Sequence, residues 1–346
     1  MVGQPAVPYV SAAGDAFAIG RAHGTTRAAS LRAFLADSLT RLNQILPAPV
    51  SMDALVPAIR AYRAEIAAAA PELADEVRGL AQGAGISLDQ ATLLQIRREV
   101  MGYRVVRAMG DCTCYARAAD GVLAQTVDLN GNLEDQLCVL RIARAGSPRR
   151  VLLISFGGLL GYLGLNSDGL AIGLTLVLGG KWHPGLPPYL AIRYLLDTSG
   201  TVADAIEALR ELRLASSRTI VLCDSRTCAY VEILEGELRI TETDQVVHTN
   251  HYLDPGFASS DEINVFARNS SVRRLQACRS RLARIPAGAG TEDHFALLSE
   301  GPINVPGNGN IRREHTVAAV VMMPRAGELH LRSGDPALTA TQVFVV

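Results

Sequence analysis

The pattern of residues along the chain changes sharply near Gly110, and this change limits the possible folds more than any other feature of the 346 residues. Before it, the sequence is rich in alanine, and residues 28–46, 52–70 and 88–106 carry apolar side chains at the three- and four-residue spacing of amphipathic helices. After it come short β-like runs separated by turn residues. Such an order predicts an α+β protein with antiparallel sheets covered by helices. Because no linker rich in Pro or Ser divides the two parts, we expect them to pack as one body.

Local signals place several of these elements. Ser87 and Gln90 resemble a capping box at the start of the helix expected over 88–106. Asp120-Gly121 predicts a hairpin turn between neighbouring strands. The glycine-rich segment 157–164 has neither the Walker pattern nor a dinucleotide fingerprint, so we expect a tight connection between two strands. The further strands expected are 137–143, 151–156, 170–176, 218–222, 229–233, 238–241, 246–249, 316–322 and 329–332, and the further helices are 188–196, 202–212 and 270–282.

Composition excludes several classes of function. Hydrophobic residues make up 49% of the chain and charged residues 19%, which favours a packed globular protein. Lys and Arg (33) balance Asp and Glu (34), so the chain offers no basic excess for a nucleic acid or an anionic membrane. The apolar stretch 151–178 is interrupted by glycines and by Asp168, which argues against a spanning helix. We therefore expect a small-molecule partner.

Six cysteines in so long a chain are too few for a disulfide scaffold, and the first ten residues lack the pattern of a signal peptide. Both features favour a reducing cytoplasm as the location of the protein.

The residues alone leave the chemistry open. Cys112-Thr113-Cys114 begins the first predicted hairpin, Asp128 follows its second strand, and His248-Thr249-Asn250-His251 ends another β-like run. Cysteines in strands commonly pack as small hydrophobic residues, and a C-x-C pair also occurs in redox and metal sites. The two histidines could hold zinc, although no H-E-x-x-H pattern surrounds them.

The order of the motifs along the chain resembles the penicillin acyltransferase family (acyl-coenzyme A:6-aminopenicillanic acid acyltransferase and its bacterial relatives), which are peptidase C45-like cysteine N-terminal-nucleophile hydrolases. Each motif is weak alone, whereas their order and spacing together are specific. The matching segments are 20–24 with G-x-x-H-G, 70–85 with "PEL..EI.GIA.GAG", 94–99 with "LN.R.E", Cys112-Thr113 with the start of the catalytic subunit, 125–128 with "GQNWD", 164–171 with "GFNSAGVAV", 185–187 with Gly-Leu-Pro before a helix, and 247–251 with "VHTNH".

The resemblance implies a four-layer αββα sandwich with a helical N-terminal part, and self-cleavage between Asp111 and Cys112. Cleavage would give a helix-rich small subunit, residues 1–111, and a β-rich catalytic subunit, residues 112–346, associated as a heterodimer whose further oligomerisation is left open. It would also free the α-amine of Cys112. With a reference pKa of about 8, that amine can act as the general base without a histidine.

The resemblance also implies the roles of the site residues. Cys112 is the expected nucleophile, Asn250 the oxyanion donor, and Asp128 the group that orients the Cys112 α-ammonium. Four further residues are candidates for the substrate side: Arg273, Arg313, Cys114 and Thr113. His248 and His251 are expected to be structural.

This chain departs from the family pattern at several positions. Asp111 stands where the family has Gly, Cys114 where relatives carry Ser or Thr, and Val127 where they carry Trp. The "SICR" element is matched only loosely by residues 310–313.

The predicted function is hydrolysis of an amide in a small N-acylated compound through a thioester acyl-enzyme, with no metal and no cofactor. An alternative is transfer of an acyl group from a thioester donor such as acyl-CoA to a small amine. Two other hypotheses are an uncleaved, non-catalytic ligand-binding homologue, and a Cys/His metalloprotein.

Overall fold

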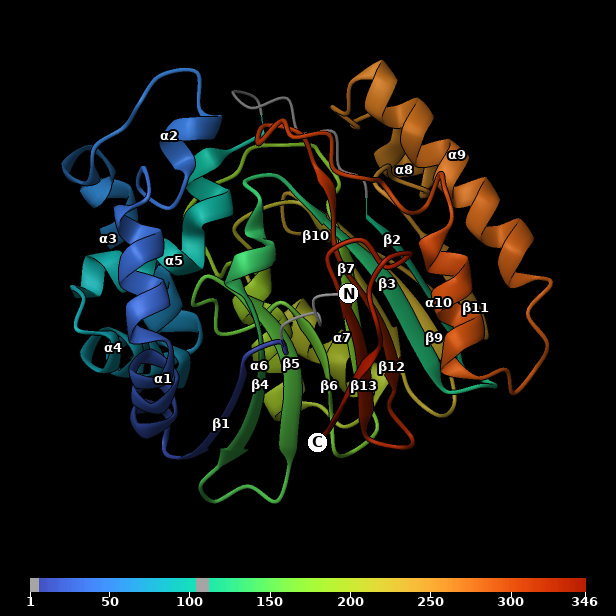
Figure 1. Ribbon diagram of the computed structural model, residues 1–346, viewed down its shortest axis with the longest axis horizontal. Helices are drawn as coiled ribbons and strands as arrows, with labels where there is room; N and C mark the ends of the chain where they lie inside the picture. The colour runs from blue at the N-terminus through green and yellow to red at the C-terminus, as the bar shows by residue number, and fades with distance from the viewer. Residues whose placement is uncertain (1–5, 104–111) are drawn as a thin grey trace.

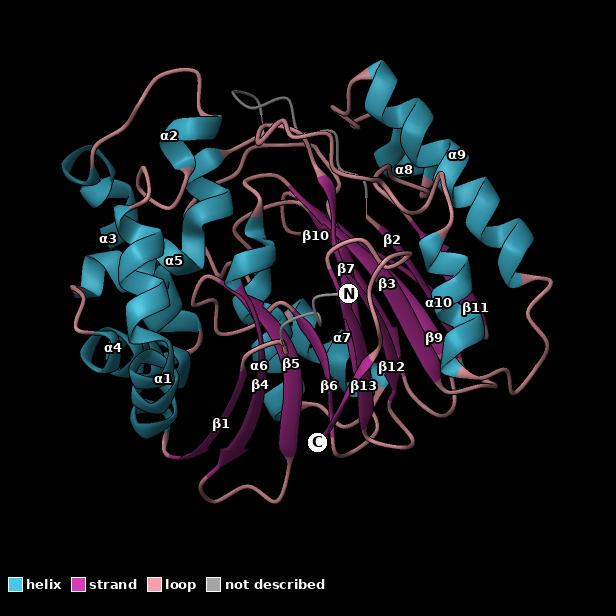
Figure 2. Ribbon diagram, in the orientation of Figure 1, coloured by secondary structure: helices cyan, strands magenta, loops and turns pink. Residues whose placement is uncertain are grey.

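The computed structural model describes residues 6–103 and 112–346, and within these ranges it is an α+β structure built on two β-sheets (Figures 1 and 2). The first sheet has the strand order β1-β4-β5-β6-β7-β8-β9-β10. Only its β1–β4 pair is parallel, and every other neighbouring pair is antiparallel. Its strands are β1 (Tyr9–Gly14), β4 (Leu137–Arg144), β5 (Arg150–Phe156), β6 (Leu163–Asn166), β7 (Ala171–Thr175), β8 (Arg218–Cys223), β9 (Cys228–Leu234) and β10 (Glu237–Thr243).

The second sheet is antiparallel throughout, in the order β11-β2-β3-β12-β13-β14. Its strands are β2 (Thr113–Arg117), β3 (Val122–Leu129), β11 (Gln245–His248), β12 (His315–Met323), β13 (Glu328–Ser333) and β14 (Gln342–Val345). The hairpin predicted at Asp120-Gly121 is confirmed: Gly121 has φ +59°, and β2 pairs with β3.

The two sheets pack face to face, with β2 and β3 against β7 and β8, and helices cover their outer faces. On the first sheet lie α6 (Pro188–Thr198) and α7 (Val202–Arg210). On the second lie α9 (Val265–Leu282) and α10 (Thr291–Ser299), which follow the short α8 (Pro255–Ala258). The expected αββα order of layers is therefore confirmed, and its interior is a continuous apolar core.

The N-terminal helices gather at the β1 side of the first sheet, at the left of Figure 1. They are α1 (Ala16–Ala36), α2 (Leu42–Ile45), α3 (Met52–Ala69), α4 (Pro71–Ala84) and α5 (Leu88–Met101). In the described ranges no helix combines the length and apolarity that crossing a membrane requires.

Glycines bring α1 and α4 into close contact. A Cβ added at Gly20 or Gly24 would lie closer than 3.0 Å to the α4 backbone, and one added at Gly79 or Gly83 would lie equally close to the α1 backbone. Because each helix presents glycine to the carbonyl groups of the other, the two backbones approach without a side chain between them. The glycines of segments 20–24 and 70–85 are thus explained by the close crossing of α1 and α4.

The structure corrects several predicted boundaries. The helix expected over 28–46 is α1, which begins at Ala16 with the Asp15 carboxylate as N-cap, followed by the separate α2. Four consecutive residues with positive φ, Ser38 to Arg41, separate the two helices. The capping box at Ser87 and Gln90 is confirmed, but α5 ends at Met101, where Gly102 takes φ +65°, and not at residue 106. Strands β1, β6 and β14 and helices α8 and α10 were not predicted.

Candidate active site

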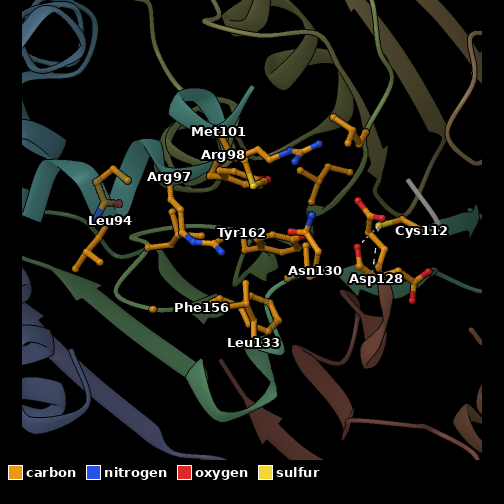
Figure 3. Close-up of a pocket in the computed structure, with 18 of the residues that line it drawn as sticks. Leu94, Arg97, Arg98, Met101, Cys112, Asp128, Asn130, Leu133, Phe156 and Tyr162 are labelled. Carbon is orange, nitrogen blue, oxygen red and sulfur yellow. Dashed lines mark hydrogen bonds between the residues drawn. The ribbon is translucent and has the colours of Figure 1, made fainter. Parts of the chain in front are cut away.

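A cavity open to solvent lies where α5, β3, β7, β8 and the start of α6 converge. Its wall is largely apolar and aromatic: the Tyr162 ring stacks on Tyr189 at 5.1 Å and meets the edge of Phe156 at 5.2 Å between centroids. Small-molecule sites are typically concave, apolar and supplied with a few polar groups. Figure 3 shows Cys112 and Asp128 at one side of the cavity and Arg97, Arg98 and Met101 at the other.

The glycine-rich segment 157–164 forms part of this wall. It connects β5 to β6, as predicted, and it turns sharply at Gly157 and Gly158, which have φ +55° and +84°. The buried Gln95 side chain of α5 holds the segment: its Nε2 donates to the carbonyl of Gly158 at 2.9 Å, and its Oε1 accepts from the N–H of Leu160 at 3.0 Å. The amide at position 95 therefore fixes the shape of the cavity.

Cys112 lies directly before β2 and is 5% exposed. Its Sγ accepts a hydrogen bond from the backbone N–H of Asp128 at 3.4 Å, drawn as a dashed line in Figure 3. All six cysteines lie in the described ranges and are free thiols, and Cys112 alone among them lines the cavity. Its location therefore separates this thiol from the other five.

Asp128 is a buried strand residue near the end of β3, beside Cys112. Its Oδ2 accepts from the Thr126 hydroxyl at 3.2 Å, and the same hydroxyl oxygen accepts from the N–H of Thr113 at 3.1 Å. Opposite this point, the pairing of β12 with β3 shifts register between Thr316 and Ala318. Such irregularities re-aim side chains next to functional sites, and here the carboxylate is held against the start of β2.

Arg274 of α9 reaches the site from the other side of the second sheet. The side chain is completely buried. Its Nη1 donates to the carbonyl oxygen of Cys112 at 2.5 Å and to the Thr113 hydroxyl at 3.2 Å, while its Nη2 donates to Asn250 Oδ1 at 2.9 Å. One guanidinium thus connects Cys112 and the Asn of the 247–251 motif.

Asn250 is held on three sides. Its Oδ1 accepts from Arg274, its Nδ2 donates to the carbonyl of Leu176 at 2.8 Å, and its backbone N–H donates to the Ser271 hydroxyl at 2.8 Å. Leu176 lines the cavity, and its carbonyl group links Asn250 to the cavity wall. An amide nitrogen carries two hydrogens, so one N–H remains in a direction fixed by the other contacts.

The two histidines of the motif are buried and hydrogen-bonded. His248 contacts Glu232 through Nε2 at 2.9 Å and the Thr175 hydroxyl through Nδ1 at 2.8 Å. His251 Nδ1 lies 2.7 Å from the Ser271 hydroxyl, and burial lowers the pKa of His251 to about 4. In the part of the chain that the structure describes, no cluster of three or more His, Cys, Asp or Glu residues could hold a metal ion.

The remaining predicted residues are dispersed. Thr113 is buried and bonded to Arg274 but does not line the cavity. Cys114 is fully buried between the sheets, where burial raises the pKa of its thiol well above the usual value. Arg273 and Arg313 are exposed, and neither lines the cavity. Asp111 lies outside the described residues.

Sequence reasoning selected Arg273 and missed its neighbour Arg274. Helix periodicity could have distinguished them: Ser271, Leu275, Cys278 and Leu282 recur at three- and four-residue spacing and form the buried face of α9. Arg274 lies on that face, three residues after Ser271, and Arg273 does not.

Comparison with known proteins shows the family of the chain. The family model described as acyl-coenzyme A:6-aminopenicillanic acid acyl-transferase matches residues 116–338, well over half of the chain. The chain belongs to the acyl-coenzyme A:6-aminopenicillanic acid acyl-transferase family. The 40 kDa form of this acyltransferase from Emericella nidulans is 28% identical over 243 residues, which span 68% of this chain and 66% of that protein. The resemblance inferred from the ordered motifs is thereby confirmed.

Solved structures of lower sequence identity share the fold. Penicillin V acylase from Agrobacterium tumefaciens superposes with a TM-score of 0.53 at 15% identity, over 68% of this chain and 86% of that one. A variant of conjugated bile acid hydrolase from Clostridium perfringens superposes with a TM-score of 0.50 at 10% identity, over 68% of this chain and 97% of that one. At these identities the likeness concerns the fold alone, and it agrees with the fold predicted for this chain.

Proposed function

We propose that this chain is a self-processing cysteine N-terminal-nucleophile enzyme that hydrolyses the amide bond of a small N-acylated compound through a thioester. The observation that carries the proposal is the position of Cys112: it is the one thiol of six that lines the cavity, and it stands at the start of β2 between Asp128 and the Arg274–Asn250 pair. Relatives whose names specify acyltransferase, acylase and hydrolase activity support the reaction class.

The proposed activation consumes one water molecule. The Cys112 thiol gives up its proton as its sulfur attacks the carbonyl carbon of Asp111. The peptide C–N bond then breaks as the departing nitrogen takes up a proton, and the acyl group has moved from nitrogen to sulfur. Water then hydrolyses the thioester, which leaves a carboxylic acid on Asp111 and frees the thiol and the α-amine of Cys112. Arg274, which holds the Cys112 carbonyl, would fix the residue during this rearrangement.

In turnover, the free α-amine takes the proton from the Cys112 thiol, and the thiolate attacks the substrate carbonyl carbon. Asp128 is placed to orient the resulting α-ammonium. The second N–H of Asn250 would donate to the oxyanion, because Arg274 and the Leu176 carbonyl hold the rest of that amide. The ammonium then protonates the leaving amine, and water releases the acid from the thioester.

A second candidate is acyl transfer, favoured by the description of the family as an acyl-transferase. The same thioester would form, from acyl-CoA or another thioester donor, and an amine in place of water would resolve it. A non-catalytic, uncleaved ligand-binding protein is the alternative outside these reaction classes. The free thiols fit the cytoplasmic location that we propose for all three.

One incubation separates these functions. The purified protein is mixed with N-acyl amides in one arm, and with an acyl-thioester donor plus small amines in the other. Products are measured by mass spectrometry, with Cys112→Ala as the control. Free acid from the amides supports the hydrolase. New amide without free acid would overturn it in favour of the transferase, and no Cys112-dependent product in either arm would overturn both.

A further inference from the structure

Three arginines line the cavity away from Cys112, and the function proposed above does not use them. Arg97 and Arg98 are consecutive residues of α5, and Arg218 begins β8. In Figure 3 the labelled Arg97 and Arg98 lie across the cavity from Cys112, with Tyr162 and Asn130 between. A ligand that reaches from Cys112 to these arginines would cross the aromatic wall.

Each of these arginines has one guanidinium nitrogen, Nη2, that is buried and makes no hydrogen bond to any residue that the structure describes. Unsatisfied buried donors are rare, and for charged groups they cost more than for neutral ones. Three such donors on the wall of one cavity point to a ligand that accepts hydrogen bonds there.

Other contacts fix the directions of these guanidinium groups. Arg97 Nε donates to the carbonyl of Thr40 at 2.8 Å. Arg218 Nη1 donates to the carbonyl of Ser217 at 2.6 Å, and its guanidinium carbon lies 5.1 Å from the centre of the Trp182 ring. Arg98 approaches the same ring at 5.9 Å. The unsatisfied nitrogens are therefore held in place before a ligand binds.

The charge at this end of the cavity is not balanced. Among the residues that the structure describes, two carboxylates accompany the three arginines: Glu99 lies 3.6 Å from Arg218 Nη2, and the charge of Glu314 acts on Arg98. Burial, and then the neighbouring Arg98, lower the pKa of Arg97 to about 10, while burial and Arg218 lower that of Arg98. One further negative charge would match the third arginine.

We propose that the substrate is an amide that carries a carboxylate at the end remote from the scissile bond, bound by Arg97, Arg98 and Arg218. This assignment rests on the function proposed above. A carboxylate presents two acceptor oxygens and matches the planar arrangement of guanidinium donors. The apolar cavity wall between Cys112 and the arginines would contact the middle of the substrate, and the Cys112 sulfur would attack the carbonyl carbon of its amide.

The first test is binding, which does not depend on turnover. Ketone isosteres, in which a CH₂ replaces the amide N–H, are titrated calorimetrically into the processed wild-type protein. One pair mimics N-octanoylglycine and N-octanoylglycinamide, with the charge on the amine side. The other mimics adipic acid monoanilide and its neutral carboxamide, with the charge on the acyl side. A phosphate analogue, the ketone isostere of N-octanoyl-aminoethyl phosphate, tests phosphate, the other anion that guanidinium groups bind through paired hydrogen bonds.

We expect the acid of one pair to bind about 10- to 100-fold more tightly than its neutral partner, the range for a lost charged hydrogen bond. Arg98→Gln should reduce or remove this preference, because binding of the acid weakens more than binding of its neutral partner, whereas Arg279→Gln, on the exposed face of α9, should preserve the preference. Equal binding within both pairs, or tighter binding of the phosphate than of either acid, would overturn the proposal.

Hydrolysis of the corresponding amides is then compared. If an acid isostere is preferred but no amide is hydrolysed, the arginine site stands and the proposed function fails. If amides are hydrolysed equally well with and without the carboxylate, and the isosteres bind equally, the function stands and the arginine site fails. The comparison of acid with neutral partner needs no arginine variant, so it remains decisive even if Arg98→Gln does not fold.

Discussion

Burial makes the thiols of Cys114, Cys138 and Cys278 poor nucleophiles, because the thiolate is the reactive form and a low dielectric disfavours it. It raises the pKa of Cys138 to about 11 and that of Cys278 to about 12, and it raises the pKa of Cys114 well above its usual value. Cys112 differs in lining a cavity and in accepting an N–H from the Asp128 backbone. The Cys112 sulfur also lies 3.7 Å from the Asp128 carbonyl oxygen, so the Asp128 backbone fixes the thiol at the wall of the cavity.

Arg274 should be a positioning residue, since it bonds the Cys112 carbonyl and the Asn250 side chain together. We expect Arg274→Gln to lower kcat by about 10²-fold, the scale of losing one preorganised donor, with a smaller change in KM. Arg274→Lys should recover part of the loss. Steady-state kinetics on protein checked for native near-UV circular dichroism measures this.

The exposed neighbour is the matched control. Arg273→Gln should leave kcat close to the wild-type value, because Arg273 lies outside the cavity. The reverse result, with Arg273 essential and Arg274 dispensable, would favour the sequence-based choice of Arg273 as the substrate ligand.

His23 should make the protein sensitive to acid. It is buried in α1, and burial, followed by the charges of Arg27 and Arg193, lowers its pKa to about 3. The unfolded chain, with a pKa near 6.5, binds the proton more readily, so the stability due to neutral His23 is complete above pH 6.5 and is lost as pH falls toward 3.

Over that range the loss is about 1.4 kcal/mol per pH unit. His23→Leu should reduce the slope of unfolding free energy against pH by that amount, as measured by urea denaturation from pH 7 to pH 5. An unchanged slope would show that His23 titrates normally in the folded protein.

At the scale of elements, the crossing of α1 and α4 depends on glycine. Gly83→Ala should destabilise the protein by about 2–3 kcal/mol, because the new Cβ meets the Arg21 backbone of α1 closer than 3.0 Å. Gly290→Ala is the matched control: this glycine has φ −74°, and a Cβ added there would have its nearest neighbouring atom 3.9 Å away. Thermal unfolding compares them, and equal shifts in Tm would argue against the close crossing.

The same crossing explains why one boundary escaped prediction. Gly20 and Gly24 interrupt the apolar pattern of α1, so periodicity alone placed the helix start twelve residues late, at 28 rather than 16. Those glycines are where α4 makes contact. A local pattern cannot show that a weak helix former is required by a distant helix.

After residue 111, strands were predicted well where the local sequence shows either alternating apolar and polar residues or a continuous apolar run. Strand β1 was not predicted, because its partner β4 lies more than a hundred residues away and pairs with it in parallel. The same limit applies to the candidate site, where local motifs are visible and long-range contacts are not. Ordered motifs identified Cys112, Asp128 and Asn250 as candidates, but Arg98 and Arg218 share a cavity only through the fold.

At the scale of the whole molecule, the segments before and after residue 111 are tied together by more than the connecting chain. Strand β1 pairs with β4, and the buried Arg193 of α6 forms two hydrogen bonds with Glu76 of α4, at 2.8 and 2.9 Å. The Tyr9 ring stacks on Phe344 at 5.8 Å. These contacts would survive a cut before Cys112.

We therefore expect fragments 1–111 and 112–346 to co-elute in size-exclusion chromatography under native conditions and to separate only in denaturant. Breaking one partner of a buried ion pair costs about 3–5 kcal/mol, so Glu76→Ala should lower the denaturant concentration at which the fragments part. Separate elution in native buffer would contradict the single-body packing.

The central claim is that Cys112 becomes an N-terminal nucleophile, and intact-mass spectrometry with N-terminal sequencing of the purified protein tests it most directly. The account predicts two fragments, one beginning at Cys112, and an acyl adduct on that residue after exposure to an acyl-thioester probe. Cys112→Ala should yield a single uncut chain without an adduct. A wild-type chain that stays uncut and takes up no acyl group at Cys112 would contradict the account.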